Sequence, residues 1–218
     1  MLNKKKALRK IIKVRVSAIS ADERQKREEI LHNNLFSMPE FLAAESVMLF
    51  ANLPDEIDTF SLIDKCFDMG KKVYLPVING DDMTACEFKG EYKIGRYGIK
   101  EPVVKQLGIS VQTSGEPSLL GLSRVQPEIT SEASNFRNEE LGMVTEPVEG
   151  PEHFDFVLVP GVGFSPNGYR LGRGKGYYDK FLSKYSNLFT VGVCFREQFY
   201  LDIPTEPHDI PMNKVLVI

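Results

Sequence analysis

The sequence lacks any apolar run that approaches the roughly 20 residues needed to cross a bilayer as a helix, so no membrane helix is expected. Its first residues, MLNKKKALRKIIKV, carry lysines but no apolar signal-peptide core. The three cysteines, Cys66, Cys86 and Cys194, form neither a CxxC pair nor an even set for disulfides. We therefore expect a cytoplasmic protein with reduced thiols, in which Cys66 and Cys194 are core residues.

An excess of positive charge is also absent, because the formal net charge is -3 at pH 7. Such a chain has no global basic field to hold nucleic acid, and any attraction for anions must be local. Its 218 residues are 42% apolar and 26% charged, which suits one α/β domain with a substantial core. Nothing indicates an obligate dimer, and we expect a monomer.

Hydrophobic periodicity predicts helices that alternate with strands, which favours a mostly parallel sheet in a layered α/β fold. We expect inward-facing Ile11 and Ile12 on the first helix, and Ile30 and Leu31 on the second. Asp58 is expected to cap the third helix, and SADE at residues 20–23 matches a capping box. Helices are expected at residues 2–18, 21–36, within 57–70 and at 176–185, and strands at 46–53, 71–78, 84–90, 154–164, 189–195 and 213–218.

Residues 104–150 break this alternation. They are rich in Ser, Glu, Gly, Pro and Thr, with seven glutamates and only three cations. Loops of this length are uncommon inside a compact domain. We interpret this segment as a surface insertion in a single domain that spans residues 1–218.

The stretch NGYRLGRGKGYYDKFL, residues 167–182, holds four glycines and three basic residues between Gly168 and Tyr178. It is not a P-loop, because Gly176 stands where Ser or Thr is required, and it is not GxGxxG, because Tyr177 replaces the last glycine. Glycines nevertheless let backbone N–H groups approach phosphate oxygens, while Arg and Lys supply charge. The stretch is predicted to bind phosphate at the carboxyl end of the sheet. The alternative is a solvated basic turn.

Asp179 follows the basic loop at the start of the next predicted helix. A carboxylate there favours the helix dipole. It could also hold Mg²⁺, which prefers one or two carboxylates together with substrate phosphates. Of the two tyrosines that precede it, Tyr177 and Tyr178, we expect at least one in the core and one facing the site.

The longer motif LVPGVGFSPNGYRLGRGKGYYDKFL resembles the 5-formyltetrahydrofolate cyclo-ligase family, also called 5,10-methenyltetrahydrofolate synthetases. KKALR near the start, SADERQ, DEIDT, GVCFREQ and the late HD resemble further family motifs. The resemblance covers about residues 4–103 and 155–218 and leaves out the insertion. It implies a three-layer α/β/α fold with a mostly parallel sheet, similar to the sugar-isomerase and CoA-transferase group.

The resemblance also implies an activity. It is the ATP- and Mg²⁺-dependent closure of 5-formyltetrahydrofolate, with or without a polyglutamate tail, to 5,10-methenyltetrahydrofolate, with release of ADP and phosphate. The formyl oxygen would be phosphorylated and then displaced as phosphate by N10. Catalysis of this kind consists mostly of positioning and of neutralising phosphate charge.

Site residues are carried over from the matching motifs one at a time. Arg173 and Lys175 are implied as catalytic, and Asp179 and Asp209 as Mg²⁺ ligands. Folate contacts are implied for Ala51, Glu56, Arg173, Gly174, Lys175, Gly176 and Tyr177. ATP contacts are implied for Lys5, Arg9, Arg170, Leu171, Gly172, Arg173, Gly174, Lys175, Gly176, Tyr177 and Tyr178.

Taken alone, these residues have plainer interpretations. Lys5 and Arg9 lie four apart on one helical face and would suit a solvated surface. Glu56 would suit a turn, and Asp209 an ordinary loop. The match at Ala51 is weak, because the local FANLP differs from the family pattern.

Two other functions stay open. A sugar-phosphate isomerase or CoA transferase on the same fold has no obvious use for the pair Asp179 and Asp209, and would show no dependence on ATP. A non-catalytic folate- or nucleotide-binding protein would bind both ligands without forming product. The joint presence of Glu56, Lys175, Asp179 and Asp209 argues against it, because loss of function usually removes some catalytic charges.

Overall fold

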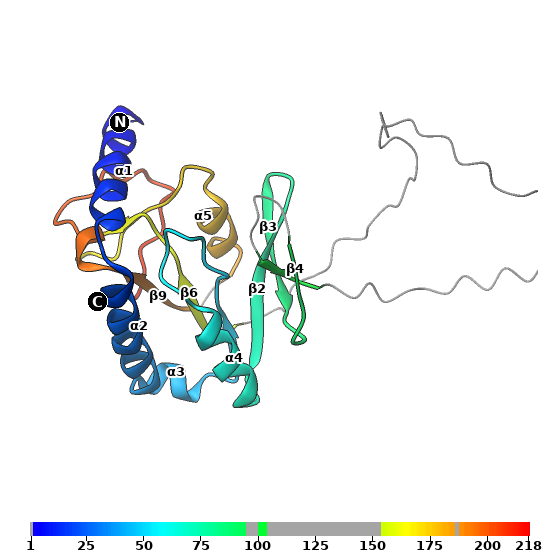
Figure 1. Ribbon diagram of the computed structural model, residues 1–218. Coiled ribbons are helices and arrows are strands. Elements are labelled where there is room, and N and C mark those ends of the chain that lie inside the picture. Colours follow the sequence, from blue (N-terminus) through cyan, green and yellow to red (C-terminus); the bar gives the residue numbers. More distant parts are fainter. Residues whose placement is uncertain (1, 95–99, 104–153, 186–187) are drawn as a thin grey trace, which may run out of the picture. The chain divides into compact units, whose positions relative to one another are not determined.

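The computed structural model describes residues 2–94, 100–103, 154–185 and 188–218, and its main element is a six-stranded sheet (Figure 1). The strands lie in the order β10–β9–β6–β1–β2–β3. Neighbouring strands are parallel except β2 and β3, which pair antiparallel at one edge. Their bounds are Ser46–Met48 for β1, Lys72–Asn79 for β2, Asp82–Glu87 for β3, Phe156–Val159 for β6, Phe189–Cys194 for β9 and Lys214–Val217 for β10.

Helices cover one face of this sheet, and a shorter helix with adjoining segments covers the other. Figure 1 shows α1 and α2 following one another along one side of the sheet. The four helices of the first face are α1 at Leu2–Ser17, α2 at Ala21–Phe36, α3 at Pro39–Ala43 and α4 at Phe60–Asp68. The second face carries α5 at Tyr177–Leu182.

Smaller elements complete the described chain. Two antiparallel ladders join β4 to β5 and β7 to β8. A 3-10 helix, η2, follows β9. The bounds are Tyr92–Ile94 for β4, Lys100–Pro102 for β5, Gly163–Phe164 for β7, Arg170–Leu171 for β8 and Arg196–Gln198 for η2.

Alternate side chains of the central strands enter two separate cores. Phe156 and Leu158 of β6 pack under the first four helices, whereas Val157 and Val159 pack with Phe181 of α5. All four β6 side chains are buried, which explains the continuous apolar run of this strand. Burial of each such side chain stabilises the fold by about 1.5–3 kcal/mol. The prediction of a three-layer fold with a mostly parallel sheet is confirmed.

The boundaries of α1 and α2 agree with the prediction to within one residue, whereas α3 was not predicted, and two expected core residues lie at the surface. Ile11 and Ile30 are 49% and 48% exposed, whereas the adjacent Ile12 and Leu31 are 1% and 0% exposed. Neighbouring helical residues point about 100° apart, and on these two helices only the second of each pair faces the core. The apolar pattern could not decide which one.

The capping box at residues 20–23 forms only in part. Ser20 Oγ accepts a hydrogen bond from the Glu23 backbone N–H at 3.3 Å. The Glu23 carboxylate instead accepts from Arg27 Nε at 2.7 Å. The prediction that Asp58 is the N-cap of the third helix was wrong by one residue, since α4 has Thr59 at this position and Asp58 accepts from the Phe60 N–H at 3.1 Å.

The expected strand at residues 46–53 is shorter than predicted, because β1 ends at Met48. Beyond it the backbone is held by Thr59. The Thr59 hydroxyl donates to the Phe50 carbonyl, and its N–H donates to Asn52 Oδ1 at 3.0 Å. The apolar residues after Met48 therefore turn out of the ladder instead of extending it.

The order of the strands creates a crevice between β1 and β6. These two strands are neighbours, but the chain continues from β1 to β2 on one side and from β6 to β9 on the other. Their outgoing loops thus diverge at the carboxyl edge of the sheet. Open α/β folds bind ligands at such a point.

No helix among the described residues is long and apolar enough to cross a membrane. The predicted insertion at residues 104–150 lies outside the described residues, and the single-domain organisation stays a prediction.

A tight contact between β9 and β7 tests the packing of the core that contains Val157, Val159 and Phe181, called the second core. A Cβ at Gly192 would overlap the ring of Phe164, which is fully buried. We expect Gly192→Ala to lower the free energy of unfolding by about 1–3 kcal/mol, measured in urea, because overpacking displaces a buried ring. The same substitution should cost less in a Phe164→Leu background. Equal costs in both backgrounds would show that Phe164 is not the obstacle.

Candidate active site

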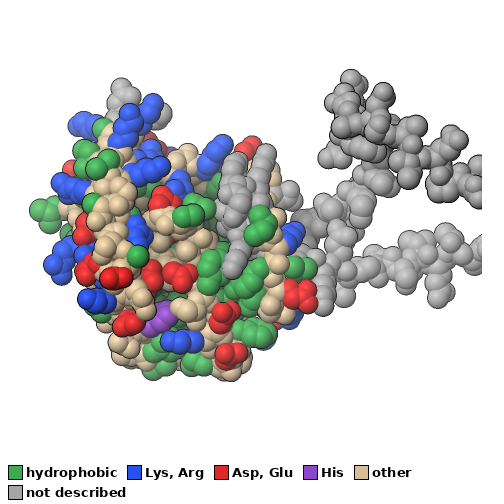
Figure 2. All heavy atoms as spheres, viewed as in Figure 1, with side chains coloured by type: hydrophobic (Ala, Val, Ile, Leu, Met, Phe, Trp, Pro, Cys, Tyr) green, Lys and Arg blue, Asp and Glu red, His purple; other side chains and the backbone are tan. Residues whose placement is uncertain are grey.

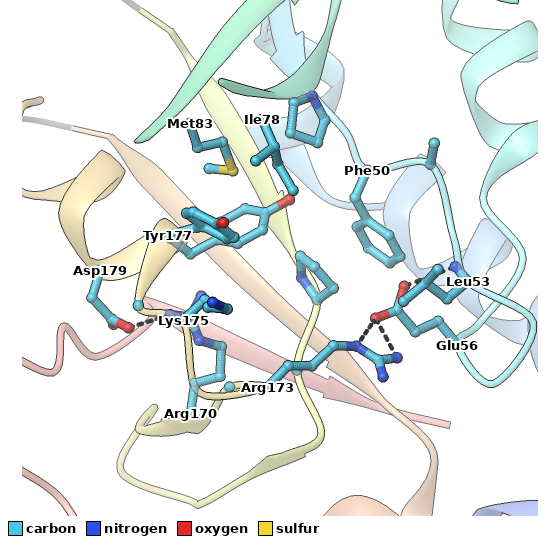
Figure 3. Close-up of a pocket in the computed structure, with 17 residues that line it drawn as sticks. Phe50, Leu53, Glu56, Ile78, Met83, Arg170, Arg173, Lys175, Tyr177 and Asp179 are labelled. Atoms are coloured by element: carbon cyan, nitrogen blue, oxygen red, sulfur yellow. Dashed lines mark hydrogen bonds and ion pairs between the residues drawn. The ribbon is translucent and has the colours of Figure 1, made fainter. Parts of the chain in front are cut away.

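Two adjoining pockets lie at the crevice between β1 and β6. The first, called the apolar pocket, is lined by Phe50 and Leu53 after β1, by Ile78 and Met83 from the β2–β3 edge, and by the glycine-rich segment. Figure 3 shows Ile78, Met83 and Tyr177 at one end of this pocket and Glu56 with Arg173 at the other.

The second pocket, called the polar pocket, lies between α1, the glycine-rich segment and the loop at residues 206–210. Helix α1 carries seven cations and no acidic residue. Figure 2 shows Lys and Arg side chains gathered on this helix. Lys5 and Arg9 face the polar pocket, and Arg9 Nε donates to the Gly172 carbonyl at 2.8 Å. The first helix and the glycine loop are thus joined directly.

Every site residue predicted from the sequence lines one of these pockets or both. The apolar pocket alone includes Ala51, Glu56, Arg173, Tyr177 and Tyr178. The polar pocket alone includes Lys5, Arg9, Leu171, Gly174 and Asp209. Both are lined by Arg170, Gly172, Lys175, Gly176 and Asp179.

The glycine loop adopts a backbone that depends on glycine at two positions. Gly174 and Gly176 have φ angles of 108° and 69°, a left-handed region that other residues rarely adopt. The following helix, predicted at 176–185, spans only the six residues of α5. Because so short a helix has a weak dipole, basic side chains and backbone N–H groups around the pocket must supply most of the attraction for anions.

Arg173 closes the mouth of the apolar pocket by bridging to the loop after β1. Its Nε and Nη2 donate to Glu56 Oε1 at 3.1 and 2.9 Å. Its Nη1 and Nη2 also donate to Asp55 at 3.3 and 2.8 Å. Burial lowers the pKa of Arg173, but the hydrogen bonds and charges of Asp55 and Glu56 outweigh it, and the net pKa is raised.

Glu56 also holds its own turn. Its second oxygen, Oε2, accepts from the Leu53 N–H at 2.9 Å, and the Glu56 N–H donates to the Leu53 carbonyl at 2.9 Å. Glu56 is therefore a turn residue and, at the same time, a residue of the apolar pocket. The fixed turn aims the carboxylate into the pocket.

The two expected metal ligands face the polar pocket, and each is paired with a cation. Lys5 Nζ donates to Asp209 Oδ2 at 2.9 Å, and Arg170 Nη2 donates to Asp179 Oδ2 at 2.8 Å. The Ile210 N–H, next to Asp209 in the chain, donates to Asp179 Oδ1 at 3.4 Å. Burial raises the pKa of Asp209, but the Lys5 hydrogen bond and others offset this, and the net pKa is lowered. Both aspartates therefore lie on one small surface.

This donor set fits Mg²⁺ bound together with phosphate. Among the described residues, no group of three or more His, Cys, Asp or Glu side chains forms a metal cage. Mg²⁺ commonly takes only one or two carboxylates and completes its shell with phosphate oxygens and water. Asp179 and Asp209 suit that arrangement.

Comparison with known proteins identifies the family. A family model described as the 5-formyltetrahydrofolate cyclo-ligase family matches residues 1–119 and 110–218. The chain is 26% identical to the mouse 5-formyltetrahydrofolate cyclo-ligase over 97% of this chain and 92% of that protein. It is 25% identical to the Escherichia coli K12 protein of the same name, over 94% and 96% of the two chains. The chain belongs to the 5-formyltetrahydrofolate cyclo-ligase family.

A solved structure agrees with this assignment. The Aquifex aeolicus 5,10-methenyltetrahydrofolate synthetase matches with a TM-score of 0.70 and 28% identity, over 98% of this chain and 89% of that one. Two predictions are confirmed. The chain is a member of this cyclo-ligase family, and the family is a family of ligases.

Arg170 lies at the wall between the two pockets of this cyclo-ligase family member. It is 7% exposed, and its guanidinium lies 5.3 Å from the centre of the Tyr178 ring. Only Nη2 is bonded; Nε and Nη1 are buried without a partner in the described part of the chain. Buried unpaired donors are costly, and an anion at this wall would satisfy them.

Sequence reasoning did not find the apolar wall of the site, or Asp55 and Glu206, two of the carboxylates that pair with its cations. Phe50, Ile78 and Met83 lie in or next to strands, where apolar residues are ordinarily interpreted as core. Asp55 and Glu206 lie in turns rich in charged residues. The DE pair at residues 55–56 was a usable signal, because two adjacent carboxylates can share one guanidinium, as Asp55 and Glu56 share Arg173.

We expected at least one tyrosine in the core and one facing the site, but the two tyrosines do not divide these roles. Tyr177 and Tyr178 are both half-buried, both line the apolar pocket, and both pack against the second core. The Tyr177 hydroxyl donates to the Gly80 carbonyl at 3.3 Å. The Tyr178 hydroxyl is buried with no partner among the described residues, and burial raises its pKa far above the usual value.

Tyr178→Phe tests whether this hydroxyl belongs to a ligand instead of the fold. Removing a buried, unpaired hydroxyl should leave the free energy of unfolding unchanged or raise it by up to about 1 kcal/mol in the ligand-free protein. Urea denaturation measures this, with Tyr177→Phe as the matched control that loses a real hydrogen bond. A clear destabilisation by Tyr178→Phe alone would mean that the hydroxyl has a partner in the folded chain.

Proposed function

We propose that this protein uses ATP and Mg²⁺ to close 5-formyltetrahydrofolate to 5,10-methenyltetrahydrofolate, releasing ADP and phosphate. The observation that carries the proposal is the shared wall between an apolar pocket and a cationic pocket. An apolar pocket with a carboxylate, Glu56, at one end suits a flat, hydrogen-bonding ring. A cationic pocket beside a glycine loop suits a polyphosphate.

The folate ring is assigned to the apolar pocket. Phe50, Ile78 and Met83 would contact its faces, and Glu56 would accept hydrogen bonds from ring N–H groups. Ala51 lies in the same pocket, in agreement with the folate contact inferred for it. The ring N–H groups would replace the Arg173 donors that Glu56 now accepts.

The triphosphate is assigned to the polar pocket. Lys5 and Arg9 come from α1, and the loop from Leu171 to Gly176 supplies backbone N–H groups and Lys175. A phosphate could accept from the unpaired donors of Arg170 at the wall. This places the terminal phosphate next to the apolar pocket, where the formyl group would lie.

The chemistry then needs two displacements. The formyl oxygen attacks the terminal phosphorus, and the bond from that phosphorus to the bridging oxygen of ADP breaks. N10 next attacks the formyl carbon and loses its proton, and the formyl oxygen leaves with the phosphate. Arg170, Arg173 and Lys175 offset the negative charge on the transferred group in both steps.

The metal would be held by Asp179 and Asp209. Bound there, Mg²⁺ would neutralise phosphate charge and help to orient the terminal phosphate. Lys5 and Arg170, which pair with these carboxylates in the described structure, are then free to move to phosphate oxygens.

The first experiment is a spectrophotometric assay. Purified protein, 5-formyltetrahydrofolate, Mg²⁺ and ATP should generate the near-ultraviolet absorbance of the methenyl product, and omission of ATP should abolish it. Product without ATP would exclude the phosphorylation route. Binding of both ligands without product would indicate a non-catalytic relative.

Lys175→Ala tests the phosphate role of the loop. Lys175 is exposed at the two pockets and contributes little to the core, so we expect kcat/KM to fall at least about 100-fold while the unfolding midpoint stays unchanged. Lys184→Ala is the matched control, since Lys184 is exposed outside both pockets and, in the described part of the chain, pairs with Asp82 at 3.8 Å. Near-normal turnover by Lys175→Ala would remove Lys175 from the mechanism.

A further inference from the structure

Arg173 is held by two adjacent carboxylates that differ in their surroundings. The Glu56 side chain is 13% exposed and lines the apolar pocket, whereas the Asp55 side chain is 44% exposed and lies outside it. Glu56 uses one oxygen for Arg173, and Asp55 uses both oxygens for Nη1 and Nη2. Asp55 therefore makes the bidentate pair that suits a guanidinium best.

A substrate ring that donates hydrogen bonds to the Glu56 carboxylate must displace Arg173 from this carboxylate. The loop that carries Arg173 is glycine-rich on both sides, and Arg173 itself is 45% exposed, so nothing in the local backbone would keep the side chain at the mouth. Asp55 is the remaining described partner. Its Oδ atoms accept from Nη1 and Nη2, so this pair can persist while the bonds from Nε and Nη2 to Glu56 are given up.

We propose that Asp55 is a positioning residue, which retains Arg173 at the mouth of the apolar pocket after substrate has replaced the arginine at Glu56. This inference rests on the proposed function of Glu56 and Arg173. Without Asp55, the displaced guanidinium would swing into solvent and seldom lie beside the transferred phosphate.

The electrostatics of the mouth agree with a persistent pair. Burial raises the pKa of Asp55, but the Arg173 hydrogen bond and charge outweigh it, with a smaller contribution from Lys13 of α1, and the net pKa is lowered. Asp55 thus stays ionised at neutral pH and remains an acceptor for Arg173.

The proposal makes kcat and KM respond differently. The Asp55–Arg173 bonds exist both before and after substrate binds, so their energy cancels from KM. In the reacting complex, these bonds determine the fraction of time that Arg173 lies beside the transferred phosphate. We expect Asp55→Asn to lower kcat about tenfold and to change KM less than about twofold.

A double-mutant cycle identifies the route of the effect. Asp55→Asn should have no further effect in an Arg173→Gln background, and Asp55→Glu should recover part of the loss. Glu23→Gln is the matched control, because Glu23 is a 46% exposed carboxylate paired with Arg27 away from both pockets. It should leave kcat unchanged.

Three kinetic outcomes would overturn the inference. If Arg173→Gln lowers kcat but Asp55→Asn does not, Arg173 acts without Asp55. If Asp55→Asn is equally harmful with and without Arg173, Asp55 acts on something else. Full turnover by Arg173→Gln would reject the proposed role of Arg173 together with the inference.

A second readout needs no turnover. In NMR spectra of the Arg173 side chain, addition of 5-formyltetrahydrofolate without ATP should shift Nε, which donates to Glu56, and should leave the Nη protons restricted in the wild type but averaged in Asp55→Asn. Averaged Nη protons in the wild-type complex would reject the positioning role. An unshifted Nε would reject the substrate role of Glu56 itself.

Discussion

Arg170 lies between the two pockets, 7% exposed, and donates to Asp179 at 2.8 Å, with its guanidinium carbon 5.3 Å from the centre of the Tyr178 ring. This one guanidinium joins the start of β8 to the first turn of α5. The loop between them carries Arg173, Lys175 and the glycines, so its path depends on that junction. Two nitrogens of this buried cation have no partner among the described residues, which is costly, and an anion bound at this wall would satisfy them.

Three cations of the site have an internal carboxylate partner. Lys5 pairs with Asp209, Arg170 with Asp179, and Arg173 with Asp55 and Glu56. These pairs neutralise the three cations in the ligand-free site, in a setting where unpaired ions are expensive. Under the proposed function, ligand binding would therefore exchange the partners of these cations and carboxylates and would not leave new unpaired charges. Phosphates would take the cations, and metal and ring N–H groups would take the carboxylates.

The two pockets combine different parts of the chain. The apolar pocket uses the loop after β1 and the antiparallel β2–β3 edge, whereas the polar pocket uses α1 and the loop before β10. Only the glycine-rich segment contributes to both. A reaction between a flat organic group and a phosphate therefore has one place at which both reactants can meet.

The sequence by itself determined the layered fold, the boundaries of the first two helices and which motif residues line the two pockets. Periodicity and glycine spacing report local backbone preference, and the motif from 158 to 182 is long enough to carry a family resemblance. The sequence could not show whether Ile11 or Ile12 is buried, or that β1 ends at Met48. Both outcomes depend on what packs nearby. Only the tertiary structure decided that Asp55 holds Arg173 and that Lys5 reaches Asp209. These partners lie 118 and 204 residues apart, and no local preference encodes a contact at such separation.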